Sequence, residues 1–232
     1  MKVAIVVICL ADKGEHELLA ETNKDTMGRT ATENVKIFYV WGLGREKKDE
    51  QDFITYFRED HGAVLKKTLA FFEHYVNEEF DYILRVNDGA YIDIPVMLEF
   101  LKDKPRTKFY CGILGNVVGI NFASGSAFFL SKDLIQLIVA LKDQFHEMHI
   151  DDVAIGEFMM NNGIPIHEGA VRVILHYDGK TRQITEEVYR EEDFDESKVY
   201  HWRLRCDDGH REVDCEHFKR LYKTLNNKNG AS

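Results

Sequence analysis

The chain has 232 residues, of which 44% are hydrophobic and 12% aromatic, a composition that excludes a disordered polypeptide and allows a sizeable buried core. Its formal net charge of −10 argues against a nucleic-acid partner or an anionic membrane surface, because both select basic proteins. An acidic protein can still bind phosphate in one locally positive pocket, if a metal ion, an arginine or a lysine lies there.

The amino terminus begins with the apolar decapeptide MKVAIVVICL, which is too short to span a bilayer and is predicted to form a first buried strand at residues 3–10. We expect no membrane span, and therefore a cytoplasmic protein or a domain cut from a larger one. Residues 1–225 are predicted to form a single domain and 226–232 a disordered tail. The four cysteines are too scattered for a disulfide framework and are expected to be buried thiols.

Strand and helix patterns alternate along most of the chain, which indicates an α/β sandwich. Residues 45–51 and the acidic stretch 178–198 are expected to be exposed loops. Predicted strands are 3–10, 35–41, 81–86 and 108–114, and the segments 164–166 and 170–176 are expected to be extended. Predicted helices are 15–21, 52–79 with a break near Gly62, 95–101, a long helix over 131–145, 149–160, and one near 215–225.

The apolar run at 81–86 stops at the triplet Asn87-Asp88-Gly89, whose residues favour a turn. A second short run follows, and then a helix that Asp93 can cap and that has Pro95 in its first turn. Open α/β sheets bind their ligands at the carboxyl ends of strands. The triplet is therefore either part of a ligand site or a plain reversal of the chain.

Four short motifs follow one another between residues 52 and 156. Their order and spacing resemble those of the β-1,3-galactosyltransferase and Fringe-like glycosyltransferases, over roughly residues 1–170. The resemblance implies the GT-A fold, an α/β fold with a mixed, mostly parallel central sheet flanked by helices. Residues 52–56 with 64–69 approximate the family pattern D-x-x-x-Y-x-x-L-x-x-K-T, and residues 87–89 occupy the place of its acidic triplet. Residues 123–131 resemble its C-S-G-x-G-Y-V-L-S. Asp151-Asp152-Val153 with Gly156 resembles its E-D-V-x-x-G.

The resemblance implies transfer of a sugar from a nucleotide diphosphate, with UDP the expected nucleotide, to a hydroxyl of a glycan or other acceptor. The diphosphate leaving group must be neutralised, usually by a divalent cation that carboxylates hold, here Mn²⁺ or Mg²⁺. In the family the acidic triplet binds this ion, but here only Asp88 is acidic, between Asn87 and Gly89. Arg85 matches a basic residue of the family and can supply countercharge, unless it is a solvent-exposed arginine at the strand edge.

Related enzymes recruit a late histidine to the metal. His201 is the predicted second ligand beside Asp88, His176 is its rival, and an ordinary surface histidine is the alternative for both. The small side chains at 123–127 allow a ligand to approach the backbone closely. The residues predicted to bind the donor are Arg85, Asn87, Asp88, Ser124, Gly125 and Asp151.

An inverting transfer needs a carboxylate that takes the proton from the attacking hydroxyl. Asp152 matches the family's base, although Asp151 and Asp152 both lie where a helix starts and either can serve as its N-cap. The predicted function is an inverting glycosyltransferase with Asp152 as general base. The alternative is a nucleotide-sugar-binding domain that has kept the fold and lost catalysis. A dinucleotide-dependent enzyme is disfavoured, because no G-x-G-x-x-G follows the first strand.

Overall fold

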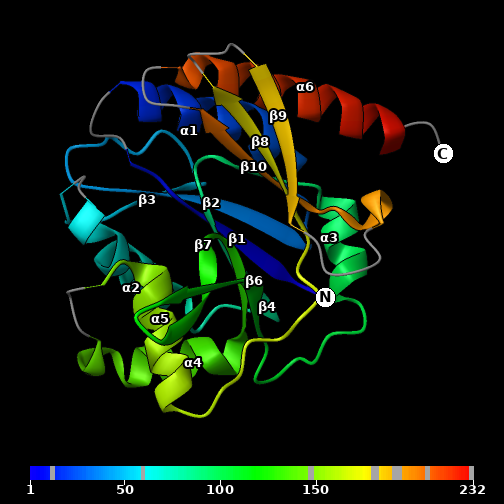
Figure 1. The fold of residues 1–232 in the computed structure, drawn as a ribbon. Helices are drawn as coiled ribbons and strands as arrows, with labels where there is room; N and C mark the ends of the chain where they lie inside the picture. Colours follow the sequence, from blue (N-terminus) through cyan, green and yellow to red (C-terminus); the bar gives the residue numbers. More distant parts are fainter. Residues whose placement is uncertain are drawn as a thin grey trace.

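The structure is a computed structural model that describes residues 1–10, 14–58, 61–145, 149–178, 183–189, 195–206 and 210–229. These residues form a six-stranded sheet, a four-stranded sheet and helices that pack against them (Figure 1). None of the described helices is both long and apolar enough to cross a lipid bilayer.

The six-stranded sheet has the strand order β3-β2-β1-β4-β7-β6. The strands β3, β2, β1 and β4 run parallel to one another, whereas β7 is antiparallel to both β4 and β6. This arrangement confirms the predicted mixed, mostly parallel central sheet. The strands are β1 (Val3–Ile8), β2 (Val35–Trp41), β3 (Asp52–Ile54), β4 (Tyr82–Asn87), β6 (Tyr110–Val117) and β7 (Ile120–Ser131).

Strand β1 lies inside this sheet and is buried along its whole length. Because successive side chains of a strand point to opposite faces, Val3, Ile5 and Val7 enter one apolar cluster while the residues between them enter another. The first cluster includes residues of α1 (Glu15–Thr26), α3 (Ile94–Leu101) and α6 (Arg211–Asn229). The second includes residues of α2 (Val64–Tyr75), α4 (Lys132–Ala140) and α5 (Asp151–Asn161). Helices therefore cover both faces of the sheet, as predicted.

The four-stranded sheet has the order β5-β10-β8-β9 and was not predicted. Strand β10 lies antiparallel to β5 and parallel to β8. The backbone N–H of Leu204 in β10 also donates to the carbonyl of Gly89 at 2.8 Å. The sheet therefore brings the C-terminal part of the chain against the turn after β4. Its strands are β5 (Ala90–Ile92), β8 (Arg172–Asp178), β9 (Gln183–Tyr189) and β10 (His201–Cys206).

Four predictions about local structure are wrong. Residues 52–54 form β3 because they pair with β2, and residues 183–189 form β9 because they pair with β8. The helix expected over 131–145 ends at Ala140 and a 3₁₀ turn follows at 142–144. The helix α6 packs along α1 and continues through Asn229, inside the tail expected to be disordered (Figure 1), while residues 230–232 lie outside the described chain.

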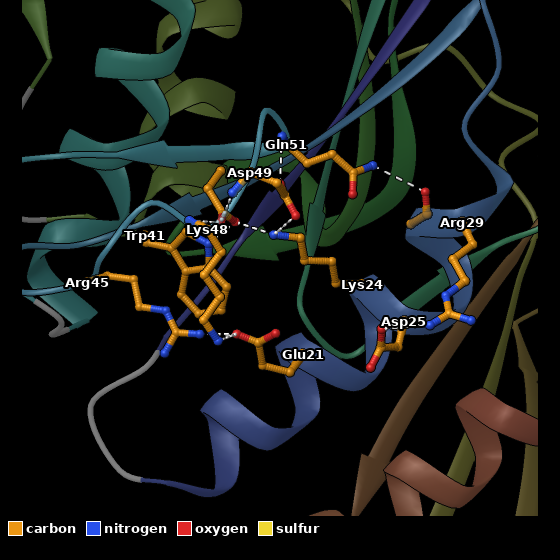
Figure 2. Close-up of polar contacts among 11 residues, drawn as sticks. Glu21, Lys24, Asp25, Arg29, Trp41, Arg45, Lys48, Asp49 and Gln51 are labelled. Atoms are coloured by element: carbon orange, nitrogen blue, oxygen red, sulfur yellow. Dashed lines mark hydrogen bonds and ion pairs between the residues drawn. The ribbon is translucent and has the colours of Figure 1, made fainter.

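A buried carboxylate fixes the β2–β3 edge of the sheet to α1. Asp52 is 4% exposed and accepts hydrogen bonds from Lys24 Nζ at 2.7 Å, Trp41 Nε1 at 2.9 Å and the N–H of Lys48 at 2.9 Å. Figure 2 shows Lys24 extending from α1 toward Asp49, with which it forms a second ion pair at 2.9 Å. Burial alone would raise the pKa of Asp52, but these hydrogen bonds outweigh it and hold the pKa below its ordinary value.

We predict that Asp52→Asn lowers the free energy of unfolding by about 2–4 kcal/mol, because Lys24 would lose the more buried of its two carboxylate partners. Asp25→Asn is the matched control, since Asp25 pairs with Arg29 at the surface (Figure 2) and should leave stability unchanged. Urea denaturation measures both. The difference in the free energy of unfolding between wild type and Asp52→Asn should have its full size above about pH 4 and shrink as the pH falls through the lowered pKa of Asp52. Equal stability of the two variants would contradict this role.

Candidate functional site

A cleft of about 370 Å³ lies at the carboxyl end of β4. It is bounded by the β4–β5 turn, by β7, by β10 and by the first residue of α6. The location agrees with the expectation that ligands bind at the carboxyl ends of the strands. The lining residues are Asn87, Asp88, Gly89, Ala90, Ser126, Arg203, Leu204, Arg205, Cys206 and Arg211.

The turn that carries the triplet is held from two sides. The buried Asn23 of α1 donates through Nδ2 to the carbonyls of Asp88 at 2.9 Å and Ala90 at 3.0 Å. On the other side, Leu204 donates to Gly89. A Cβ atom added at Gly89 would lie 3.0 Å from the carbonyl oxygen of Leu204, closer than most real Cβ contacts. The approach of β10 therefore disfavours any side chain, acidic ones included, at the third position of the triplet.

Asp88, predicted to bind donor and metal, lines the cleft and is largely buried. Its Oδ2 lies 3.4 Å from Nδ1 of His16 and accepts a long hydrogen bond of 3.5 Å from the N–H of Leu10. Asn87 also lines the cleft, and its Oδ1 accepts a hydrogen bond from Arg85 at 2.5 Å. Of the six residues predicted to bind the donor, the structure therefore places these two in the lining of the cleft.

Arg85 has a different position from the one the sequence suggested. Its Nε lies 2.7 Å and its Nη2 3.0 Å from the carboxylate of Asp151, and both side chains are only 2% exposed. Its Nη1 donates to the carbonyl of Gly125 as well as to Asn87. The hydroxyl of Thr68 donates to the same aspartate at 2.7 Å. Arg85 and Asp151 thus form a buried ion pair that positions their neighbours. This arrangement gives both side chains a structural role, and their contact with the donor stays a prediction.

Asp152 lies in the first turn of α5, whose N-cap is Ile150, so neither aspartate is the cap. Its Oδ2 accepts the N–H of Gly125 at 2.7 Å and its Oδ1 accepts the N–H of Val153 at 2.9 Å. Burial and the neighbouring charge of Asp151 raise the pKa of Asp152 above its ordinary value, against the lowering effects of the Gly125 N–H and Arg85. A fixed carboxylate with a raised pKa is suited to accept a proton.

The small-residue segment of β7 connects this carboxylate to the cleft. Ser126 lines the cleft, and its hydroxyl and that of Ser124 accept hydrogen bonds from Arg172 at 2.7 and 3.3 Å. Between them, a Cβ atom at Gly125 would lie 2.9 Å from Oδ2 of Asp152. Glycine at this position therefore lets Asp152 lie against the strand, one residue from the cleft wall.

His201 does not line the cleft. His201 is the first residue of β10 and pairs with Ile92. Arg205 of the same strand lines the cleft together with the triplet. At about 3.3 Å per residue, His201 lies about 13 Å along the strand from Arg205. Burial and the charges of Arg172 and Arg203 lower the pKa of His201 well below its ordinary value. The expected pairing of Asp88 with His201 around a metal ion is therefore corrected by the strand register. The rival candidate, His176, belongs to β8 and pairs with Arg205 of β10.

The described residues do not fit a carboxylate-held divalent cation. Of the described residues that line the cleft, Asp88 alone is acidic. Over the described ranges of the chain as a whole, no group of three or more His, Cys, Asp or Glu side chains is placed to hold a metal ion. Divalent cations bound by proteins usually have several oxygen ligands, so one carboxylate is a poor match.

Sequence reasoning missed the arginines of the cleft, Arg203, Arg205 and Arg211. A signal was present, because the strand sequence HWRLRC places Arg203 and Arg205 two residues apart and hence on one face. The sequence did not reveal that this strand would lie beside the triplet, about 115 residues earlier in the chain.

No protein-family model and no curated protein sequence matches this chain. Among solved structures, it is similar to a glycosyltransferase involved in the glycosylation of the major capsid of PBCV-1, with a TM-score of 0.54 and 11% identity over 95% of this chain and 100% of that chain. It also matches the glycosyltransferase GlyE of Streptococcus pneumoniae TIGR4 at a TM-score of 0.42 and 14% identity, over 72% of this chain and 45% of that one, which is too weak to carry an argument. The first match shows that the chain has a glycosyltransferase fold.

Close packing of α5 on β7 sets the position of Asp152. A Cβ atom added at Gly156, one helical turn further along α5, would lie 2.3 Å from Cβ of Phe122 and 2.7 Å from the carbonyl oxygen of Asn121. The helix can approach the strand this closely only with glycine at that position. This contact gives a physical reason for the glycine in the D-D-V-x-x-G motif.

We predict that Gly156→Ala lowers the free energy of unfolding by about 1–3 kcal/mol, because the added methyl group overpacks the α5–β7 contact. The sign of the change in unfolding free energy distinguishes this contact from an exposed helix, because glycine-to-alanine changes within exposed helices stabilise by about 1 kcal/mol. Thermal denaturation measures the effect. A variant as stable as the wild type, or more stable, would show that α5 does not pack on β7 as described.

Proposed function

We propose that the protein is an inverting glycosyltransferase that moves a sugar from a nucleotide diphosphate, with UDP the expected nucleotide, to a hydroxyl of a glycan or other acceptor. The observation that carries this proposal is the placement of Asp152, a fixed carboxylate with a raised pKa, one residue from the wall of a cleft at the end of β4. The glycosyltransferase fold supports the same reaction class.

In the proposed reaction, Asp152 accepts the proton of the acceptor hydroxyl while the hydroxyl oxygen attacks the anomeric carbon of the donor sugar. The bond from that carbon to the diphosphate breaks on the opposite face, so the configuration inverts. The N–H groups of Gly125 and Val153 hold the carboxylate in one orientation. Such fixed geometry lowers the entropic cost of bringing acceptor and donor together.

The donor is proposed to lie in the cleft that Asn87, Asp88 and Ser126 line, with the predicted sugar-binding residues Ser124 and Gly125 preceding Ser126 on β7. The Fringe-like resemblance makes Mn²⁺ or Mg²⁺ the expected cofactor. The described residues supply a single carboxylate for it, so no step of the proposed reaction is assigned to a metal ion.

A second candidate function is binding of a nucleotide sugar without turnover. The triplet favours it, because Asn87 and Gly89 stand where the resembling family has acidic residues and β10 closes the third position. The two candidates differ in one measurable property, which is whether bound donor is consumed.

We predict that the protein, incubated with a panel of nucleotide sugars and candidate acceptors, transfers or hydrolyses at least one donor. Asp152→Asn should lower kcat about 10²–10⁴-fold and leave donor affinity within a few-fold, because the base acts on the acceptor. Asp143→Asn, at an exposed site, is the matched control and should retain full activity. Donor binding without turnover across the panel would favour the binding domain instead.

The pH dependence of kcat/KM should show an acid limb, because a protonated Asp152 cannot accept the acceptor's proton. Since the pKa of Asp152 is raised, the midpoint of this limb is expected above the ordinary aspartate value of about 3.9. Activity should fall as the pH drops through that midpoint. An acid limb that persists unchanged in the residual activity of Asp152→Asn would assign the proton transfer to another group.

A further inference from the structure

The cleft carries a local excess of positive charge on an acidic protein. Among the described residues that line it, Arg203, Arg205 and Arg211 accompany a single carboxylate, that of Asp88, whereas the chain as a whole has a net charge of −10. A concave site with one sign of charge concentrates ligands of the opposite sign. The electrostatics of the lining therefore favour an anionic ligand.

The arginines meet there for separate structural reasons. In β10, Arg203 and Arg205 share one face, while Leu204 between them is buried in the apolar core. The hydrogen bond from Leu204 to Gly89 fixes this part of β10 against the triplet. Arg211 comes from the start of α6, which is anchored by the packing of α6 on α1.

Arg211 is held in place by a buried partner. Its Nη1 donates to Asp214 at 2.8 Å, and the side chain of Asp214 is 1% exposed. Burial lowers the pKa of Arg211, but Asp214 and the charge of Asp88 across the cleft outweigh it and raise the pKa. A guanidinium has five N–H donors in a planar fork, so the bond to Asp214 orients the group while the fork still reaches the cleft.

The same features work against a cation. The third triplet position is closed to a carboxylate by the carbonyl of Leu204. The strand that closes this position is the one that brings Arg203 and Arg205 to the cleft. Guanidinium groups match phosphate oxygens in charge and geometry and often bind them through two parallel hydrogen bonds.

We propose that Arg203, Arg205 and Arg211 bind the diphosphate of the donor and neutralise it in place of a divalent cation. This inference rests on the proposed function. In the transfer, the bond between the anomeric carbon and the diphosphate oxygen breaks and its electron pair stays on that oxygen. The new bond forms to the acceptor oxygen, whose proton passes to Asp152. The arginines stabilise the negative charge that develops on the departing nucleoside diphosphate.

Isothermal titration calorimetry with UDP, GDP, ADP and CDP, in EDTA and separately with Mn²⁺ or Mg²⁺, tests the proposal on the full chain. We expect at least one diphosphate to bind in EDTA, with an affinity that added cation changes by less than threefold. Arg205→Gln, at an exposed position, should weaken that binding about tenfold or more, because a charge-assisted hydrogen bond is lost. Arg220→Gln, an exposed change elsewhere on α6, should leave it unchanged.

The corresponding nucleoside separates diphosphate recognition from a loss of fold. Arg205→Gln and Arg211→Lys should weaken binding of the nucleoside diphosphate and leave binding of the nucleoside unaltered. Arg211→Lys keeps a positive charge beside the buried Asp214, so it guards against unfolding. Binding that requires Mn²⁺ or Mg²⁺, or arginine variants that bind the diphosphate like the wild type, would overturn the inference and leave the proposed function standing. If none of the four diphosphates binds under any condition, both fail.

Discussion

The candidate site depends on one buried ion pair, between Arg85 of β4 and Asp151 of α5. Removing one partner of such a pair typically costs about 3–5 kcal/mol, because the other charge stays buried without compensation. The pair reaches two neighbours: Arg85 also bonds to Asn87, and to the carbonyl of Gly125, whose N–H holds Asp152. It therefore joins the donor side of the site to the proposed base, across β4, β7 and α5.

Helix α2 also holds this ion pair and the end of β1 in place. Thr68 donates to Asp151, and the buried ammonium of Lys67 donates to the carbonyl of Cys9 at 2.5 Å, just after β1. These two residues belong to the K-T part of the first family-like motif. Asp52, which opens that motif, is likewise buried in contacts with α1 and β2. Much of what resembles a family signature is thus the framework that positions the site.

The site separates two electrostatic environments that the proposed chemistry requires. Around Asp152, burial and a neighbouring aspartate favour the protonated carboxyl, so the group is more basic than an ordinary aspartate. In the cleft, arginines from β10 and α6 favour an anion. Asp152 accepts the N–H of Gly125, and the next residue, Ser126, lines the cleft that holds the arginines. An acidic protein can hold both because each field is local.

The sequence by itself indicated β1, β2, β4 and β6 of the central sheet, because buried strands have local patterns. It also indicated the place of the site, because turn residues mark where β4 ends. It did not indicate β3 or β7. It also indicated Asp88, Asp152 and the glycines through short motifs. Only the tertiary structure decided that Arg85 is internal, that His201 lies away from the triplet, and that β9 and the end of α6 are ordered. It also brought three arginines to the cleft. These features arise from strand pairing and helix packing between segments far apart in the chain, which no local pattern encodes.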